Sequence, residues 1–292
     1  MPDYGHALEF GVFPTPNADN LDGIFEVVRV AEERGLDIAA IQDHPYQRRY
    51  LDTWTLLSAI GASTSTIKLA PNVASLPLRP PAVLAKAAAT LDLITDGRVE
   101  MGLGAGAFWD AIVAAGGPRR TPGESVDALI EAIGVLRDFW AGGSIFRDGE
   151  HYPVQGLKAG PKSAHAIPIW IGAYGPRMLR VTAELADGWV PSMGYADPPR
   201  LADLSEKLDS AAANAGRDPS RIRRIYNIAG SFGAGGDFLR GRPAEWAEQL
   251  ADLALQHGIG TFILGADDTD TVRTFAGEVA PAVREAVAEE RG

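Results

Sequence analysis

The chain of 292 residues is 46% hydrophobic and 22% charged and has no cysteine, so it can bury a large core, whereas disulfides, thiolate catalysis and cysteine metal sites are excluded. A net charge of −11 argues against nucleic-acid partners, which need a basic face, although it permits an anionic small ligand held by a few backbone N–H groups. The N-terminal residues lack a basic region followed by an apolar run, and no apolar stretch approaches the roughly 18 residues of a membrane span, so we expect a cytoplasmic protein with no membrane partner.

Short apolar runs alternate with longer segments of helical spacing along the whole chain. In chain order, the expected strand–helix pairs are Leu8–Pro14 with Leu21–Arg34, Asp37–Gln42 with Thr53–Ser63, Ile67–Ala74 with Pro81–Ile94, Arg98–Gly104 with Ser125–Trp140, Ile167–Gly172 with Pro176–Ala186, Gly188–Pro191 with Pro198–Ala215, Ile222–Ala229 with Pro243–His257, and Gly260–Leu264 with Thr269–Glu289. Such an order predicts an α/β protein whose parallel sheet closes through right-handed crossovers into a (β/α)8 (TIM) barrel, a single domain over residues 1–292. A doubly wound open sheet is the alternative.

Two stretches after the fourth strand interrupt the alternation. Phe108–Glu124 is rich in Gly, Pro and Arg and is expected to be a long loop. Ala141–Ala166 predicts a hairpin of strands Ser144–Phe146 and His151–Val154, because Asp148-Gly149 between apolar runs favours a tight turn. Both insertions are expected at the barrel mouth, where the βα loops of such folds build active sites.

Polar residues end the second and third predicted strands. Asp43 and His44 follow strand two, where a barrel directs the histidine toward the pocket and lets it donate a hydrogen bond or exchange a proton near neutral pH. A capping aspartate beside an ordinary loop histidine is the alternative. Asn72 and Val73 lie at the end of strand three, and a polar residue in an apolar strand indicates a bulge or a rim position.

Glycine-rich segments follow the fourth and fifth strands. Glycines alternate along Gly102–Gly106, so the backbone can approach a ligand closely there, unless the segment is simply a flexible turn. The Gly172-Ala173-Tyr174-Gly175 segment leads into Pro176, which starts a helix. Converging N–H groups at a helix N-terminus predict a phosphate site there, with an ordinary tight turn as the alternative.

Aromatic residues also gather near the predicted strand ends: Phe13, Trp54, Phe108, Trp109, Tyr174 and Trp189. They can stack on a planar ligand or pack in the core or rim. The five histidines show no HxH or HExxH spacing, and no serine lies in a GxSxG motif. We therefore expect no metal centre and no serine nucleophile, with a metal-dependent barrel hydrolase as a weaker alternative.

Together these motifs resemble the bacterial-luciferase-like superfamily of flavin-dependent oxidoreductases over nearly the whole chain. The resemblance lies in FGVF at strand one, DH after strand two, NVASLPLRPPAVLAKAAATLDLITDGRVEMGLGAGAF, and IPIWIGAYGPRML with DGW following. Its GAYGP stretch is more similar to the deazaflavin (coenzyme F420) branch than to the FMN branch of luciferases and sulfonate monooxygenases. The resemblance thus implies hydride exchange between F420 and a small organic substrate. The alternatives are an FMN-dependent monooxygenase that uses O2 and a degenerate, non-enzymatic cofactor-binding barrel.

The resemblance also implies roles for individual residues. His44, with Asp43, would be catalytic, and the substrate pocket would contain Phe13, Phe108 and Trp109. The cofactor would be bound by Asn72, Val73, Gly104, Ala105, Gly106, Gly172, Ala173, Tyr174, Gly175 and Pro176.

Three further expectations come from the resemblance. The Asn72–Val73 bond matches a position where relatives have a non-prolyl cis peptide, whose bulge supports the cofactor ring. Ala107 stands where the sugar-phosphate dehydrogenases of this branch have a glutamate acid, which argues against glucose 6-phosphate oxidation. Because relatives pair through the helices after the early strands, we expect a homodimer that uses the alanine-rich segment Ala82–Leu93.

Overall fold

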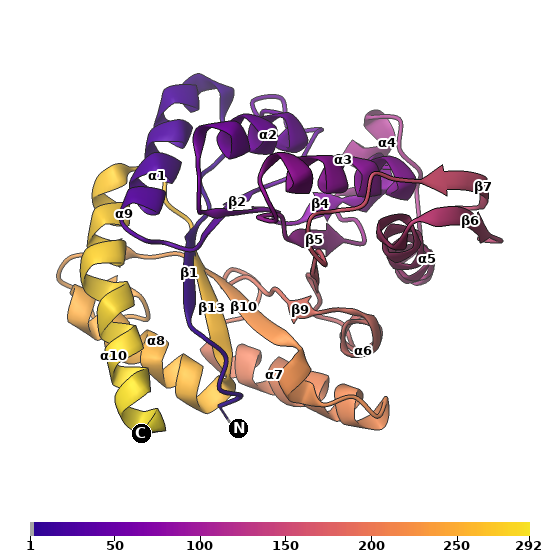
Figure 1. Ribbon diagram of the computed structural model, residues 1–292. Coiled ribbons are helices and arrows are strands. Elements are labelled where there is room, and N and C mark those ends of the chain that lie inside the picture. Colours follow the sequence, from indigo (N-terminus) through magenta and orange to yellow (C-terminus); the bar gives the residue numbers. More distant parts are fainter. Residues whose placement is uncertain (1–2) are drawn as a thin grey trace.

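Eight parallel barrel strands with surrounding helices make up the fold of the computed structural model, which describes residues 3–292 (Figure 1). Hydrogen bonds join the strands in the order β3-β2-β1-β13-β10-β9-β8-β5-β4. Residue Leu69 of β3 also bonds to Arg98 and Glu100, just before β5, at 2.8 and 2.9 Å, and these bonds close the ring. Since β3 and β4 are two parts of the third barrel strand, the predicted (β/α)8 barrel is confirmed.

The elements follow the predicted alternation. The barrel strands are β1 (Glu9–Val12), β2 (Ile38–Ile41), β3 (Lys68–Pro71), β4 (Ala74–Ser75), β5 (Met101–Gly104), β8 (Ile169–Ile171), β9 (Gly188–Trp189), β10 (Arg223–Ile228) and β13 (Ile259–Leu264). The helices are α1 (Leu21–Glu33), α2 (Thr53–Ser63), α3 (Pro81–Ile94), α4 (Trp109–Ala114), α5 (Pro122–Ala141), α6 (Pro176–Leu185), α7 (Pro198–Asn214), α8 (Pro243–His257), α9 (Thr269–Thr274) and α10 (Ala280–Arg291). One π-helical turn, Phe275–Val279, joins the last two helices. Among residues 3–292, no helix is long and apolar enough to cross a membrane.

Burial on both faces explains why the strands are mostly apolar, with charged residues at the first positions of β1, β3 and β10. All four residues of β2 are buried, as expected for a parallel strand covered by helices on one side and by the barrel interior on the other. One buried cluster fills the interior: Ile38, Ala40, Ala70, Trp170, Val190, Ile225 and Ile263. A larger cluster joins the outer faces of the strands to the helices.

The expected long loop over Phe108–Glu124 is wrong, because two helices take up most of it. α4 occupies its first half, and α5 begins inside its end, at Pro122. Thr121 and Glu124 form a capping box, in which each side chain accepts a hydrogen bond from the backbone of the other residue. The Thr-x-x-Glu spacing is a helix-start signal in the sequence itself.

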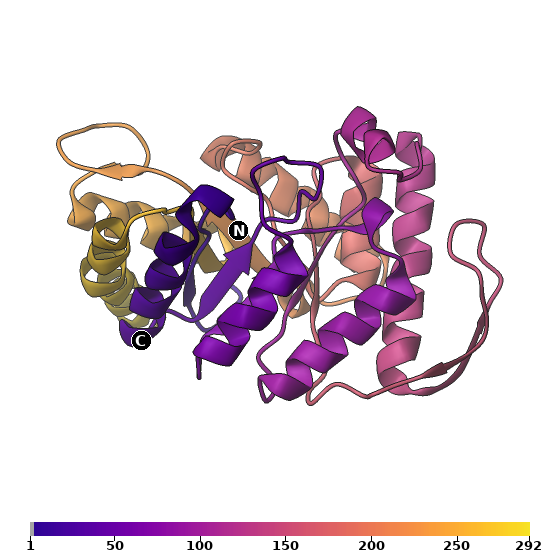
Figure 2. The same cartoon turned by 90° about the horizontal axis from the view of Figure 1, so that it is seen from above.

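The hairpin forms, but with different bounds and in a different place. Its antiparallel strands are β6 (Gly143–Arg147) and β7 (Val154–Ala159). Residues 150–152 do not pair as predicted, because their N–H groups bond to the Glu131 carboxylate of α5 at 2.8–2.9 Å. The hairpin follows the C-terminal end of α5 and packs against that helix on the side that faces away from the barrel (Figure 2). Its expected position at the barrel mouth is therefore wrong.

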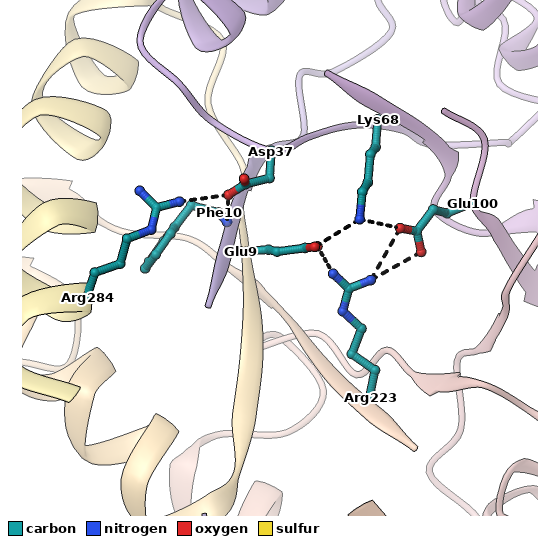
Figure 3. Close-up of polar contacts among 7 residues, drawn as sticks. All are labelled: Glu9, Phe10, Asp37, Lys68, Glu100, Arg223 and Arg284. Atoms are coloured by element: carbon teal, nitrogen blue, oxygen red, sulfur yellow. Dashed lines mark hydrogen bonds and ion pairs between the residues drawn. The ribbon is translucent and has the colours of Figure 1, made fainter. Parts of the chain in front are cut away.

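An ionic layer of Glu9, Lys68, Glu100 and Arg223 crosses the barrel interior at the N-terminal ends of its strands (Figure 3). The Lys68 ammonium lies 2.9 Å from Glu9 and 3.0 Å from Glu100, and the Arg223 guanidinium pairs with both carboxylates. Burial raises the pKa of Glu100, although Lys68 opposes the shift, and it lowers the pKa of Arg223 to about 10. Two acids and two bases thus compensate each other where water is scarce.

Arg223→Met should lower the free energy of unfolding by about 3–5 kcal/mol, because it leaves two largely buried carboxylates to share Lys68 alone. Arg29→Met is the control, since Arg29 pairs with two glutamates on the exposed face of α1, where ion pairs contribute little. Urea denaturation of both variants measures the difference. Equal loss of stability in the two proteins would contradict the role given to the ionic layer.

Candidate active site

A cavity of about 470 Å³ opens at the C-terminal ends of the barrel strands, where active sites of this fold are built. The predicted site residues that line it are Phe13, Asp43, His44, Asn72, Val73, Gly104, Ala105, Gly106, Phe108, Gly172, Tyr174 and Gly175. Its volume lies within the roughly 300–1,000 Å³ typical of small-molecule sites.

Three predicted residues do not line this cavity. Ala173 is buried in the wall, where its carbonyl accepts the Trp189 indole N–H at 2.9 Å. Pro176 starts α6 and borders a groove on the outside of the barrel. The Trp109 ring packs so closely against Gly106 that a Cβ there would lie 2.7 Å from it. Their placement does not support direct contact with a ligand in the cavity.

Asp43 follows β2 and is only 1% exposed. Its hydrogen bond to Ser75 links the end of β2 to β4. Its carboxylate accepts the Ser75 N–H at 2.9 Å and two guanidinium N–H groups of Arg79 at 2.7 and 2.8 Å. Arg79 also bonds to Asp52, the N-cap of α2, at 2.6 Å. Both Asp43 oxygens are thus engaged, so this residue can hold the loop that carries His44 but is poorly placed to exchange a proton with a substrate.

His44, Tyr46 and Phe108 form an aromatic rim at the cavity. The His44 ring stacks on Tyr46 with centroids 5.3 Å apart and meets Phe108 edge-on at 5.7 Å. Burial lowers the pKa of His44, and the nearby charge of Asp43 opposes this more weakly. Burial raises the pKa of Tyr46. At pH 7 both side chains are therefore predominantly neutral, and the imidazole can accept a proton.

Val73 lines the cavity, and the peptide bond between Asn72 and Val73 is cis, as the resemblance implied. A Cβ at Gly104 would lie 2.8 Å from the Val73 side chain, and one at Gly102 would lie 3.0 Å from it and 2.3 Å from the Pro71 carbonyl. These two glycines make room for the protein's own chain. Gly104 and Gly106 do line the cavity, and the expected close approach of a ligand to this segment stays a prediction.

An amide pair that the sequence reading missed lies deep in the cavity. The Asn72 amide donates to Asn227 at 2.7 Å, and the Asn227 amide donates to the Ser192 hydroxyl at 3.0 Å. The Tyr174 hydroxyl accepts the Ser192 N–H at 2.9 Å, and the Tyr174 ring lies 5.5 Å from that of Tyr195. Asn227 is a polar residue near the C-terminal end of the buried strand β10, which is the same signal that singled out Asn72.

Open space adjoins the turn that leads into α6. A Cβ added at Gly175 would meet no atom within 4 Å, and one at Gly172 would meet only atoms at 3.8 Å or beyond. Gly175 is the N-cap of α6, and no side chain caps that helix. A helix N-terminus with free N–H groups beside open space is suited to a phosphate, so the site fits the phosphate-bearing cofactor that the resemblance implies.

The acid expected from sugar-phosphate dehydrogenases is missing from the cavity. Ala107 lies in the lining, in the place where the resemblance would put a glutamate. Of the described residues, the single carboxylate in the lining is Asp43, which is bound by Arg79. The remaining groups in the lining that can exchange a proton are His44 and the tyrosine hydroxyls.

Comparison with known proteins agrees with this architecture. The sequence profile of luciferase-like monooxygenases matches residues 3–235. A 5,10-methylenetetrahydromethanopterin reductase of Archaeoglobus fulgidus is 34% identical over 212 residues, or 72% of this chain and 60% of that protein, so this chain spans less than two thirds of its length. An F420-dependent glucose-6-phosphate dehydrogenase of Nocardia farcinica is 29% identical over 246 residues, 81% of this chain and 72% of the relative.

A solved structure extends the likeness to the whole barrel. The coenzyme F420-dependent tetrahydromethanopterin reductase from Methanopyrus kandleri superposes with a TM-score of 0.82 at 20% identity. The superposition covers 94% of this chain and 99% of that one. Since only 6% of this chain lies outside the superposition, most of the segment beyond residue 235, where the match to the family profile ends, is included.

Proposed function

The chain belongs to the luciferase-like monooxygenase family, and on that premise we propose that it is a single-domain, F420-dependent oxidoreductase. It would transfer a hydride between F420 and a small organic substrate. The observation that carries the proposal is the open turn at Gly172–Gly175, where α6 offers uncapped N–H groups to a phosphate. The Nocardia relative and the Methanopyrus enzyme, both named for F420, support the choice of cofactor.

The lining residues divide into groups with separate tasks in this proposal. Gly172, Tyr174 and Gly175 would hold the phosphate with the N-terminus of α6, and Val73 and the segment Gly104–Gly106 would support the ring and its side arm. When bound, F420 supplies a ring carbon that accepts or gives a hydride, and the protein supplies orientation and electrostatics.

His44 is the residue that we propose for proton exchange. Its imidazole lines the cavity and is half-buried between Tyr46 and Phe108. When the carbon that bears a substrate hydroxyl gives up a hydride, the neutral imidazole would take the hydroxyl proton as the carbonyl forms; in the reverse direction it would return that proton to the carbonyl oxygen. In this proposal Asp43 and Arg79, which are bonded to each other, would hold the loop that carries His44.

Purified protein should bind F420 saturably in a fluorescence titration and bind FMN more weakly. An FMN-dependent monooxygenase remains the second candidate, since the matching family is described by that activity. Reduced cofactor should not promote oxygen consumption if F420 is the partner, because its ring carbon replaces the nitrogen at which flavins activate oxygen. Tight FMN binding with rapid oxygen uptake would favour the monooxygenase. Loss of hydride transfer with every acceptor tried would favour a non-enzymatic barrel.

We also propose that the protein is a homodimer that pairs through α3. Val83, Leu93 and Ile94 of that helix are 66%, 48% and 63% exposed, and a partner could cover these apolar side chains. Ala85, Ala88 and Ala89 of the alanine-rich segment are buried within the subunit and do not contribute to such a surface. Light scattering at micromolar concentration should give twice the monomer mass. Ile94→Glu should shift the equilibrium toward monomer, and a wild-type monomer under these conditions would contradict the proposal.

A further inference from the structure

We propose that the substrate of this cavity is an uncharged, mainly apolar molecule that binds between two aromatic walls, and that Phe108 selects it. The inference names a substrate class for the function proposed above and rests on it. Its basis is the charge and the shape of the cavity lining.

The lining that residues 3–292 form offers a substrate no unpaired charged side chain at neutral pH. Among the described residues it contains no lysine, arginine or glutamate, and its one aspartate, Asp43, is paired with Arg79 at 2.7 Å. Burial lowers the pKa of His44 and raises those of Tyr46 and Tyr174, which keeps all three neutral at pH 7. The amide pair at the deep end is neutral too.

No group in the cavity could therefore compensate a charged substrate. A carboxylate or phosphate that enters it loses hydration and gains no counter-ion, which is costly. The positive end of α6 is the exception, and the proposed function assigns it to the cofactor phosphate. The protein's net charge of −11 adds long-range repulsion of anions.

Two groups of aromatic side chains line the cavity, and we take them as its two aromatic walls. The first is the rim of His44, Tyr46 and Phe108, and the second is Tyr174 with Tyr195. Phe108 is 56% exposed and Tyr195 is 61% exposed, although rings of this size usually bury most of their surface. A planar or apolar substrate between the walls would cover both rings.

We assign the selection of substrates to Phe108 because its backbone conformation and its ring contacts hold it beside His44. It is the N-cap of α4 and adopts the left-handed conformation, with φ of 57°. That conformation is uncommon for a residue with a large side chain. Its ring meets both His44 and Tyr46, so it lies beside the group that we propose for proton exchange. Its loss would remove the apolar contact next to that group.

The test compares 2-naphthamide with 2-naphthoate, two probes of nearly the same shape that differ in charge. Calorimetric titration of the F420-loaded protein at pH 7 should give an affinity for the amide at least about tenfold higher than for the carboxylate. Equal affinities, a preference for the carboxylate, or no saturable binding of the amide would each overturn the proposal.

Matched variants test whether Phe108 determines the affinity for the amide probe. Phe108→Ala should weaken amide binding by about tenfold through loss of stacking and burial, and Phe108→Trp should restore it. Val113→Ala is the control, since Val113 is an exposed residue of the same helix outside the cavity lining. Ala107→Lys should raise naphthoate affinity at least about tenfold over Ala107→Gln, because it places a cation in the lining.

The same titrations on cofactor-free protein separate this inference from the proposed function. If F420 fails to bind but the amide is still preferred, the cofactor assignment is wrong and the charge selectivity of the cavity stands. If F420 binds and the probes are not discriminated, only the substrate class is wrong.

Discussion

His44→Ala should lower turnover by about 10²–10⁴-fold, the usual contribution of a positioned acid or base, while F420 affinity changes by no more than a few-fold. The histidine lies at the end of β2, so the barrel directs it into the cavity. With Asp43 bound by Arg79 and Ala107 in place of an acid, few groups remain that can exchange a proton with a substrate.

The pH dependence gives an independent readout of the same residue. Burial holds the pKa of His44 below its ordinary value of 6.5, and Asp43 is the one charged group that opposes this. Tyr46, which stacks on the ring, stays neutral because its pKa is raised. In the direction of alcohol oxidation the neutral imidazole is the active form. The rate of alcohol oxidation should therefore not depend on pH around pH 7. It should fall as the pH drops through the lowered pKa of His44, below 6.5.

Three measurements on His44→Ala distinguish a catalytic from a structural role. A structural histidine would give a lower melting temperature with nearly normal turnover in the folded fraction. A catalytic histidine gives normal folding and F420 affinity with slow turnover and no acidic limb in the pH profile. Turnover that survives the substitution would falsify the assignment.

Gly175→Glu should abolish F420 binding. The glutamate side chain would enter the open space beside the α6 N-terminus, where no atom lies within 4 Å of the Cβ position. Its carboxylate would occupy the place of the cofactor phosphate and repel it, while the helix N-terminus would stabilise the carboxylate itself. Because that space is open, we expect the variant to fold normally.

Gly175→Ala provides the matched control. Gly175 has φ of −86° and ψ of 154°, which suit any residue, and the added Cβ meets nothing. F420 affinity by fluorescence titration should stay within a few-fold of wild type for alanine and become undetectable for glutamate. Unchanged affinity in Gly175→Glu would place the phosphate away from this turn.

The alternation of strands and helices could be read from local patterns. Burial on both faces makes the barrel strands short, mostly apolar runs, and the helices α3, α6, α7 and α8 each begin at a proline, which suits the first helical turn. These signals lie within a few residues of the element that they specify. For that reason the predicted bounds of α2, α3 and α8 agree with the structure.

The parts of the site that follow strand ends were predictable for a related reason. Once the strands are parallel and form a barrel, residues after their C-terminal ends converge whatever the distance between them in sequence. His44, Val73, Gly106 and Gly172 meet at one cavity in this way. The sequence thus determined the barrel, its mouth and most of the residues around it.

Only the tertiary structure decided what those residues contact. The engagement of Asp43 by Arg79, the bonds of the Glu131 carboxylate to the hairpin loop, and the pairing of Asn72 with Asn227 join side chains that are 36, about 20 and 155 positions apart. No periodicity encodes such contacts, because each depends on the distance and direction between two elements after the core has packed. The charge of the cavity follows from these contacts, since a carboxylate that a guanidinium neutralises and one that faces a substrate look the same in sequence.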